Sequence, residues 1–481
     1  MRKLFRRKRP TAPKPAERDD DLNAIRRTTL QNGLRLWVRQ RPGTGTVAIL
    51  AQVPVGSRHE SKENNGISHF LEHMIFTGTR RWDEHEVTEI IRRRGGEANA
   101  RTAQEDTVYW LHLKADDLAL GLDWLSEVLF RPAIAVEKFD KERRVIINEK
   151  GGNWGRFKYV MEWVEDRGFG WNIFRAVRNR LWPESSLLLP VIGDDKSLQT
   201  IEHSGLLDFY RTHYLPNNMT LVVVGDVDPE EAEVMTEQYF GEFEAGTLPP
   251  KPEQPLTPTP PEGFRVRLHG PSINDQGQLL LGAPTPGMQH ADRYPLMVLA
   301  EIMESALTRE IRFERGLVYS IDVYPAMYTD VGYFVVYTTA ESNRFAEIQQ
   351  AIDNQIMRAI SGQLDTVAVD AARSAVRGRA LLAMEGNLNE AWWLSEDAMY
   401  TPDEEPIPDY FAAINAVTPK DIQRVANVYL AEGNRYEAIH RPGLTPRRAA
   451  LPAAITAGLG LTGVSVWLAT WLNRRKTHSK P

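Results

Sequence analysis

A proline-rich stretch near the middle of the sequence constrains the fold more than any other feature. It reads PPKPEQPLTPTPP and holds seven of the chain's 30 prolines. Proline has no backbone N–H to donate, and successive prolines favour the extended polyproline II conformation, so this stretch cannot lie inside a sheet. We therefore predict a linker over residues 246–262 between two modules, 22–245 and 263–442, each large enough for its own core.

The two predicted modules repeat the same order of elements. Each opens with an alternating strand, GLRLWV at 33–38 and FRVRLHG at 264–270. Each later has a strand that runs into an amphipathic helix, and each has a late helix such as GLLDFYRTHYL or KDIQRVANVYL. The predicted fold class is α+β, with two related modules that each layer helices on an antiparallel sheet.

The two ends of the chain differ from the modules. The first fifteen residues hold seven basic and no acidic residues, so the tail over 1–21 is either solvated or an arm that rests on anionic lipid. Residues 451–472 carry no charge over 22 positions, enough for a helix that crosses a membrane. The sequence thus predicts a C-terminal transmembrane helix and a basic tail within 443–481. This single-pass anchor would leave the two modules on the cytoplasmic side.

The composition excludes several classes of site. The formal net charge is −6 and the chain holds no cysteine. A net negative charge provides no general attraction for nucleic acid, so we predict no nucleic-acid partner. Without thiols the chain forms no thiolate zinc site, and any metal must be held by His, Asp or Glu. A formal G-x-G-x-x-G at 458–463 does not predict a dinucleotide site, because no βαβ unit surrounds it.

A short stretch in the first module carries metal-ligand chemistry. The sequence HFLEH lies inside a segment whose apolar residues recur at helical spacing. His69 and His73 then lie one turn apart with Glu72 beside them, an arrangement that can bind zinc and activate water. Asn64 or Asn65 is expected to cap the helix. The alternative is a partly exposed helix whose histidines have ordinary partners.

A third metal ligand is expected from the next long helical segment. Residues 136–150 read VEKFDKERRVIINEK and precede a pair of glycines that can end a helix. Glu142 and Glu149 are seven residues apart and share one stripe of this helix. Glu149 can complete a His, His, Glu zinc site with an open position for water, and Glu142 can orient one of the ligands. The alternative is that both glutamates are ordinary surface charges.

The spacing of these residues resembles that of a known family. HFLEH followed by Glu149, 76 residues after the last histidine, is similar to the inverted zinc motif of the pitrilysin/insulinase family, which includes the mitochondrial processing peptidases. The resemblance covers about residues 25–440. It implies one zinc ion per chain, held by the two histidines and Glu149, with Glu142 as an outer carboxylate and Glu72 as the general base.

Two further segments extend the resemblance. GGEANARTAQEDTVYW resembles the strand beside the family's cleft, with Asn99 and Ala100 at the positions that face substrate. REIRFERGLVYS resembles the segment that supplies an arginine and a tyrosine to the active site, here Arg312 and Tyr319. Residues 163–193 lack the short His-Pro-Tyr stretch that many members carry, which leaves the substrate preference open.

The resemblance implies a zinc endopeptidase that hydrolyses extended peptides or unfolded protein segments. Full-length relatives carry four modules in a clamshell and this chain carries two, so the expected partner is a second two-module chain, in a homodimer or a heterodimer. Arg312 and Tyr319 would then reach the zinc site of the partner chain. The alternative is a non-catalytic structural or partner subunit of a membrane-associated complex.

Overall fold

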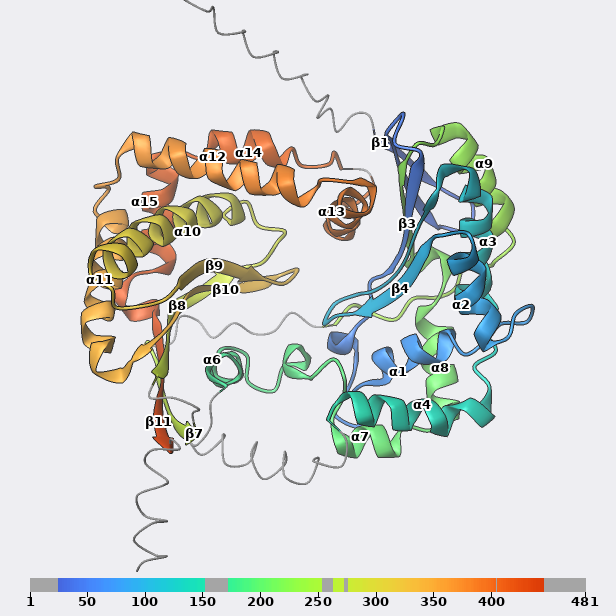
Figure 1. The fold of residues 1–481 in the computed structure, drawn as a ribbon, viewed down its shortest axis with the longest axis horizontal. Coiled ribbons are helices and arrows are strands. Elements are labelled where there is room, and N and C mark those ends of the chain that lie inside the picture. Colours follow the sequence, from blue (N-terminus) through green and yellow to red (C-terminus); the bar gives the residue numbers. More distant parts are fainter. Residues whose placement is uncertain (1–24, 152–171, 253–262, 272–275, 404, 445–481) are drawn as a thin grey trace, which may run out of the picture.

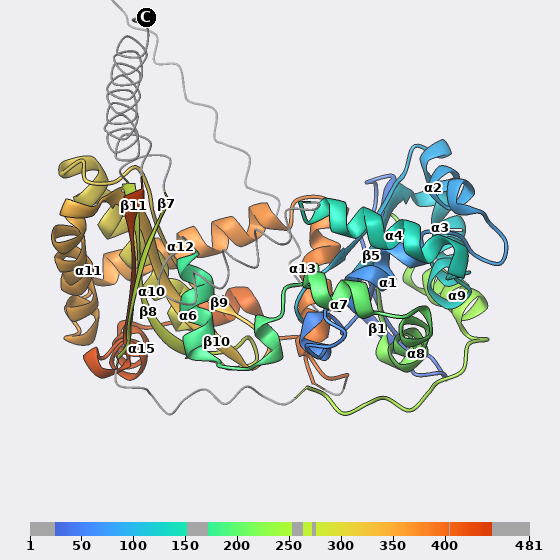
Figure 2. The same cartoon turned by 90° about the horizontal axis from the view of Figure 1, so that it is seen from below.

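The structure is a computed structural model that describes residues 25–151, 172–252, 263–271, 276–403 and 405–444. These residues form two α+β modules that lie side by side, with one sheet in each (Figure 1). Most helices lie on the outer sides of the two sheets, and a few lie in the middle of the molecule (Figures 1 and 2). The predicted two-module α+β architecture is confirmed.

The first sheet contains six strands in the order β1-β2-β6-β3-β5-β4. Neighbouring strands are antiparallel except β2 and β6, which are parallel. The central strands β3 and β6 are buried on both faces, which explains their nearly continuous apolar sequences TVAILAQV and TLVVVG. The bounds are β1 Ile25–Thr29, β2 Arg35–Gln40, β3 Thr46–Val53, β4 Glu97–Thr102, β5 Thr107–Lys114 and β6 Thr220–Gly225.

Helices from the first half of the chain cover one face of this sheet. They bury the main core of the first module, which includes Leu36, Ile49 and Leu111 of the sheet. The bounds are α1 Ile67–Ile75, α2 Glu84–Arg93, α3 Leu118–Phe130, α4 Val136–Glu149, α7 Asp195–Thr200, α8 His203–His213 and α9 Pro229–Phe240.

The second sheet contains five strands in the order β7-β11-β8-β10-β9, with β7 and β11 parallel and the other neighbours antiparallel. Its outer face packs against α10, α11, α12, α14 and α15 in a separate core. The strands are β7 Arg265–Pro271, β8 Gln276–Pro286, β9 Ile321–Met327, β10 Val331–Glu341 and β11 Tyr436–Leu444. The helices are α10 Arg293–Leu307, α11 Phe345–Ile360, α12 Thr366–Ala383, α14 Tyr410–Ala416 and α15 Pro419–Tyr429.

Short helical turns connect several of these elements. The π-helix η7, Thr308–Glu314, continues α10. The 3-10 helices are η2 Ser57–His59, η3 Ala115–Asp117, η5 Ser186–Leu188, η6 Pro216–Asn218, η8 Ser342–Arg344 and η9 Glu432–Asn434.

Each module covers the inner face of the other module's sheet with one helix. Helix α6, Ile173–Leu181, comes from the first half of the chain but buries its apolar residues against Leu280, Val335 and Tyr436 of the second sheet. Helix α13, Asn387–Tyr400, comes from the second half but packs against Trp37, Leu50 and Val222 of the first sheet. The exchange places α6 and α13 between the two sheets (Figure 1). The two modules are therefore linked by shared cores as well as by the chain.

The predicted transmembrane helix requires a correction. Within the ranges that the structure describes, no helix is long and apolar enough to cross a membrane. A span needs about 20 mostly apolar residues, whereas the longest described helix, α12, has 18 and carries Asp370, Arg373, Arg377 and Arg379. Among the described residues the fold is therefore two α+β modules with no transmembrane helix, and the predicted single-pass anchor with a cytoplasmic catalytic region is corrected with it. Residues 451–472, on which that prediction rested, and the basic tail 1–21 lie outside the described residues.

Candidate active site

Helix α1 carries the HFLEH motif and is fixed by its apolar face. Phe70, Leu71, Met74 and Ile75 are fully buried in the main core of the first module. The spacing of these residues places them on one side of the helix, and the two histidines and the glutamate lie on the neighbouring, partly exposed side. The helix cannot turn the polar side away without exposing the core.

The start of α1 is held by a carboxylate from outside the helix. The N-cap residue is Gly66, at φ 93, and it has no side chain to cap the first turn. Instead, the buried carboxylate of Glu60 accepts hydrogen bonds from the N–H groups of Gly66 at 2.7 Å and Ser68 at 2.9 Å. Burial raises the pKa of the Glu60 carboxyl, and these hydrogen bonds oppose that shift. The predicted cap by Asn64 or Asn65 is wrong, since the Asn65 side chain itself donates to Glu60.

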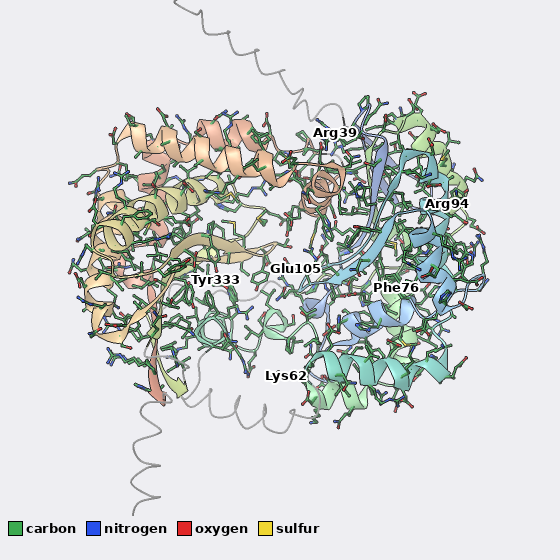
Figure 3. All side chains as sticks on the ribbon, in the orientation of Figure 1. Arg39, Lys62, Phe76, Arg94, Glu105 and Tyr333 are labelled. Carbon is green, nitrogen blue, oxygen red and sulfur yellow. The ribbon has the colours of Figure 1, made fainter. Side chains whose placement is uncertain are left out.

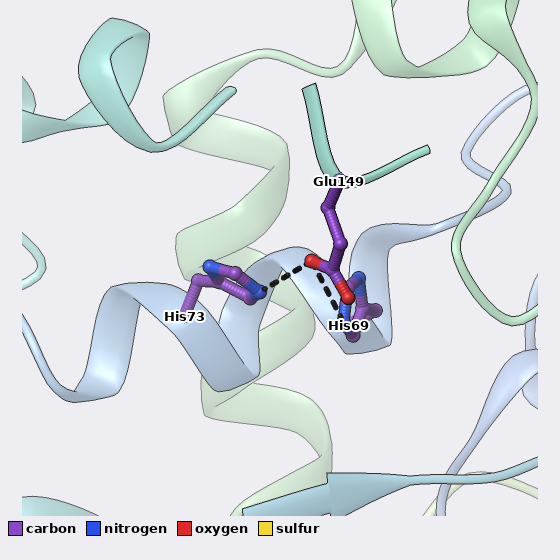
Figure 4. A group of neighbouring side chains, drawn as sticks. All are labelled: His69, His73 and Glu149. Carbon is purple, nitrogen blue, oxygen red and sulfur yellow. Dashed lines mark ion pairs between the residues drawn. The ribbon is translucent and has the colours of Figure 1, made fainter. Parts of the chain in front are cut away.

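Three side chains from two helices converge beside the polar side of α1 (Figure 4). One ligand atom from each of His69, His73 and Glu149 lies within 4.8 Å of the other two. Glu149 Oε2 is 3.9 Å from Nε2 of His69 and 3.4 Å from Nε2 of His73. The side chains of His69, His73 and Glu149 are 12%, 21% and 50% exposed, so the group opens to solvent on the side of α4.

This donor set fits a zinc ion. Two imidazoles and one carboxylate are an established three-ligand set for catalytic zinc, with a further position left open. Burial lowers the pKa of His69 to about 4, so its imidazole is neutral, and able to bind a metal, at neutral pH. The Nδ1 atom of His69 is buried without a hydrogen-bond partner among the described residues. This ring is therefore not a histidine held in place by ordinary hydrogen bonds, which was the alternative interpretation.

Glu142 lies behind one of the two histidines. Its Oε2 atom is 3.5 Å from Nδ1 of His73, whose other ring nitrogen faces Glu149. The Glu142 side chain is nearly buried, and Lys141 Nζ lies 3.5 Å from its second oxygen. A carboxylate in this position fixes the orientation of an imidazole and increases its basicity.

Glu72 contacts the edge of the first sheet. Its Oε2 atom accepts a hydrogen bond from Thr102 Oγ1, at the end of β4, at 2.5 Å. Burial raises the pKa of the Glu72 carboxyl, and the hydrogen bond and the nearby His73 oppose that shift. A raised pKa brings a carboxylate closer to the range in which it can both accept and return a proton.

Strand β4 runs past this site at the edge of the sheet. Its side chains alternate, so Asn99 and Arg101 are exposed while Ala100 and Thr102 are partly buried. The structure therefore places Asn99 and Ala100 on opposite faces of the strand. Ala100 shares the face of Thr102 and packs against the main core. Asn99 accepts a hydrogen bond from the N–H of Ala100 through its own side chain.

Arg312 and Tyr319 lie in the second module, on η7 and just after it. The Tyr319 side chain is 81% exposed, and the Arg312 guanidinium lies 5.4 Å from the centre of its ring. Within the described part of the chain, no hydrogen bond or ion pair joins Arg312 or Tyr319 to His69, Glu72 or His73. The structure brings the two residues together but does not connect them to the metal-ligand group of the same chain.

Sequence reasoning missed two residues that contact α1. Thr102 could have been found from the sequence, because side chains alternate along a strand and Thr102 therefore shares a face of β4 with Ala100. No sequence pattern points to Glu60, because it reaches α1 from a loop, and a carboxylate in a loop is expected to be a surface charge. Only the fold shows that Glu60 is buried and accepts the hydrogen bonds of the helix start.

Comparisons with known proteins agree with this geometry. Residues 35–163 match the family model described as Insulinase (Peptidase family M16). Residues 200–376 match the model described as Peptidase M16 inactive domain. The first match contains HFLEH and Glu149, whereas most of the second falls in the module that lacks an H-x-x-E-H sequence.

Similar proteins extend over nearly the whole chain. The chain is 25% identical over 426 residues to the uncharacterized zinc protease YmxG of Bacillus subtilis, covering 88% of this chain and 100% of that protein. It is 26% identical over 419 residues to the mitochondrial-processing peptidase subunit beta of Blastocladiella emersonii, covering 84% and 85%. A crystal structure of a protease from Helicobacter pylori matches with a TM-score of 0.74 at 20% identity, over 87% of this chain and 99% of that one. At this identity the last match shows a shared fold.

Proposed function

The chain belongs to the insulinase family of peptidases, family M16, and from this premise we propose that it is a zinc-dependent endopeptidase. One observation supports the proposal above the others. His69, His73 and Glu149 present three ligand atoms within 4.8 Å of one another, on the same side of α1 as Glu72. The proposal assigns one zinc ion per chain to these three ligands.

Zinc held there supplies Lewis acidity toward a peptide carbonyl and lowers the pKa of water. The protein's own contribution is a base and its support. Glu72 accepts the proton of the attacking water and returns it to the departing amine. The hydrogen bond from Thr102 Oγ1 keeps the Glu72 carboxylate in one rotamer beside the edge strand. Glu142 holds the ring of His73 so that Nε2 stays directed toward Glu149.

The substrate class follows from the edge strand. No described strand pairs with the outer edge of β4, and an extended chain that adds there would use main-chain hydrogen bonds that any peptide can make. We propose that extended peptides and unfolded protein segments bind here. Because Asn99 projects from the exposed face of β4, it is available to contact side chains of a peptide that adds to this edge.

The proposal includes a second two-module chain. Arg312 and Tyr319 have no described bond to the zinc ligands of their own chain, and the neighbouring Phe313 and Tyr319 are 72% and 81% exposed. Large apolar and aromatic side chains gathered on a surface are typical of an interface. In a dimer, Arg312 and Tyr319 of one chain would donate hydrogen bonds to the oxyanion at the zinc site of the other.

Hydrolysis of an unstructured peptide by the full chain tests the enzymatic proposal. Glu72→Gln is expected to keep about one zinc per chain and to lower hydrolysis about 10²–10⁴-fold, because the amide cannot accept a proton. Equal activity of the variant and the wild type would remove Glu72 as the base. A wild-type chain that binds zinc but hydrolyses no peptide, with or without a partner chain, would favour the non-catalytic alternative.

Subunit complementation tests the shared site. Glu72→Gln and Tyr319→Phe chains are each expected to be nearly inactive. After subunit exchange, mixed homodimers regain one complete site of two, so activity rises on mixing. Exchange without any recovery would mean that each chain completes its own site or requires a different partner.

A further inference from the structure

The zinc ligands come from two helices, so the site depends on how these helices are held together. His69 and His73 lie on α1, while Glu149 is the last residue of α4. The stacked rings of Phe70 on α1 and Phe139 in the first turn of α4, 4.6 Å apart, fix α1 against the start of α4. The end of α4 is less constrained. Glu149 is half exposed, and within the described residues its ion-pair partners are the two histidines.

The next residue ties the end of α4 to a third helix. Lys150 is the C-cap residue of α4, and its side chain is only 7% exposed. Its Nζ atom lies 2.7 Å from Oδ1 of Asp195, the first residue of α7. A nearly buried ammonium paired with a carboxylate is costly to separate, because either charge would be left without its partner. Lys150 therefore fixes the position of the final turn that carries Glu149.

The same short helix also contacts the start of α1. Ser197 Oγ on α7 donates a buried hydrogen bond of 2.6 Å to the carbonyl of Asn65, just before α1. Beside it, Gly66 and Gly193 approach so closely that a Cβ on Gly66 would lie 2.7 Å from the Cα of Gly193. Helix α7 thus contacts the start of the helix that carries the histidines through Ser197, and the end of the helix that carries the glutamate through Asp195.

We propose that the Lys150–Asp195 ion pair is a positioning contact of the zinc site. It anchors the C-terminal turn of α4 on α7, and so holds the Glu149 carboxylate at the distance from His69 and His73 that one metal ion requires. The inference rests on the proposed zinc function and adds to it two residues that touch neither metal nor substrate. Without the pair, the end of α4 frays and Glu149 spends less time in place, since the last carbonyls of a helix lack partners within it.

Zinc affinity of the full chain, measured by competition with a chromogenic chelator, tests the proposal without using activity. Lys150→Met and Asp195→Asn are each expected to lower zinc affinity about tenfold, the lower end of the range for residues that support metal ligands. The double variant is expected to lose no more than either single one. Thermal unfolding of the metal-free proteins reports the fold separately.

A control ion pair of the same length, more exposed than the Lys150–Asp195 pair, lies at the other end of the same helix. Lys138 Nζ pairs with Oε2 of Glu84 at the same 2.7 Å, but in the first turn of α4, far along the helix from Glu149. Lys138→Met is therefore expected to leave zinc affinity unchanged. Equal losses of affinity in the Lys138 and Lys150 variants would show a general effect on α4 and overturn the proposal.

The remaining outcomes separate this inference from the proposed function. A wild-type chain that binds no zinc overturns the proposed function and this inference with it. A wild-type chain that binds zinc as tightly as a folded Lys150→Met variant overturns the inference alone. Where Lys150→Met does not fold, the exchanged pair Lys150→Asp with Asp195→Lys decides the matter. Recovery of zinc affinity in that pair supports the positioning role, and a folded exchanged pair with weak affinity contradicts it.

Discussion

The second sheet, β7-β11-β8-β10-β9, repeats the arrangement β2-β6-β3-β5-β4 of the first, including a parallel pair at the same place. The helices follow the same order. In the first module α1 and α2 separate β3 from the edge strand β4, and in the second α10, continued by η7, separates β8 from the edge strand β9. In both modules two helices follow the next strand, and the helix described after them crosses to the other sheet. By this order α10 corresponds to α1, α12 to α4, and α13 to α6. The two modules are therefore two versions of one fold.

The difference between them lies on the corresponding pairs of helices. In the first module, α1 and α4 bring two histidines and Glu149 together beside β4. In the second, α10 and α12 bring together the ion pair of Glu301 and Arg379, at the wall of a pocket of about 300 Å³ beside β9. An arginine cannot ligate a metal, and no other described group of His, Cys, Asp and Glu has metal-ligand geometry. The comparison shows that the same fold can carry different side chains, with different chemistry, on its corresponding helices.

The largest expected effect tests this contrast directly. His73→Ala removes one of three protein ligands, so the zinc content is expected to fall from about one per chain to near zero, with loss of peptide hydrolysis. His290, just before α10 in the second module, is the control, and His290→Ala is expected to keep full zinc content. Metal analysis of the purified chains decides this. About one zinc ion per chain in the His73→Ala variant would contradict the assignment of the zinc site to the first module.

Much of this contrast was predictable from the sequence. The repeat of strand and helix patterns anticipated two similar modules, because the period-two and helical patterns of the core positions survive in both halves. The candidate ligand residues were predictable within each helix, because two histidines one turn apart, and two glutamates on one stripe, must share a side of their own helix. The absence of H-x-x-E-H from the second half led to the prediction that the chemistry lies in the first half.

The rest depended on contacts between distant parts of the chain. Nothing in the sequence IFRAVRNRL of α6 or NLNEAWWLSEDAMY of α13 says which sheet its apolar residues will cover. An amphipathic pattern fixes a buried face but not its partner, so the exchange of helices was missed. The same limit hid the role of Glu60 at the start of α1. The apolar segment 451–472, which was predicted to span a membrane from its hydropathy, lies outside the described residues.

Core substitutions in the exchanged helices test whether the two modules are energetically separate. Leu394 on α13 is 2% exposed and packs on the first sheet. Leu394→Ala is expected to lower the free energy of unfolding by about 2–5 kcal/mol. Because α13 belongs to the second half of the chain, we expect both modules to lose stability together in denaturant titrations. Val177→Ala on α6 provides the reciprocal test on the second sheet. Separate transitions, with only one module weakened, would contradict a shared core.

A smaller effect is expected where corresponding hairpins of the two modules meet. Arg58 is nearly buried and pairs with Glu105, on the β4–β5 turn, at 2.5 Å and with Asp330, on the β9–β10 turn, at 2.6 Å. Glu105 is labelled where the two modules approach each other (Figure 3). Arg58→Ala leaves both carboxylates without this partner and is expected to cost about 2 kcal/mol. Arg81→Ala, which breaks a more exposed pair with Asp123, is expected to cost less than about 1 kcal/mol. If urea unfolding showed the same loss of stability in Arg58→Ala and Arg81→Ala, the contact between the hairpins would stabilise the chain no more than an exposed ion pair does.

The last expected effect is a change of stability with pH, and it distinguishes the two exchanged helices by the acidic residues they carry. Helix α13 carries Asp397, whose pKa burial raises to about 7, whereas α6 carries no acidic residue. In the folded chain Asp397 keeps its proton over a pH range in which the unfolded chain, with the ordinary pKa of 3.8, has lost it. The folded state therefore binds more protons between about pH 4 and pH 7, and its stability falls as pH rises through this window.

The slope attributable to Asp397 is at most about 1.4 kcal/mol per pH unit, which is the value for one whole proton. Asp397→Asn keeps the size of the side chain but removes the titration, so the stability of the variant is expected to depend less on pH between 4 and 7 than that of the wild type. Urea unfolding at several pH values, with a probe in each module, measures this. Because α13 covers the first sheet, the effect should be as large for a probe in the first module as for one in the second. Identical pH slopes for the variant and the wild type would mean that Asp397 is ionised in the folded chain over the same pH range as in the unfolded chain.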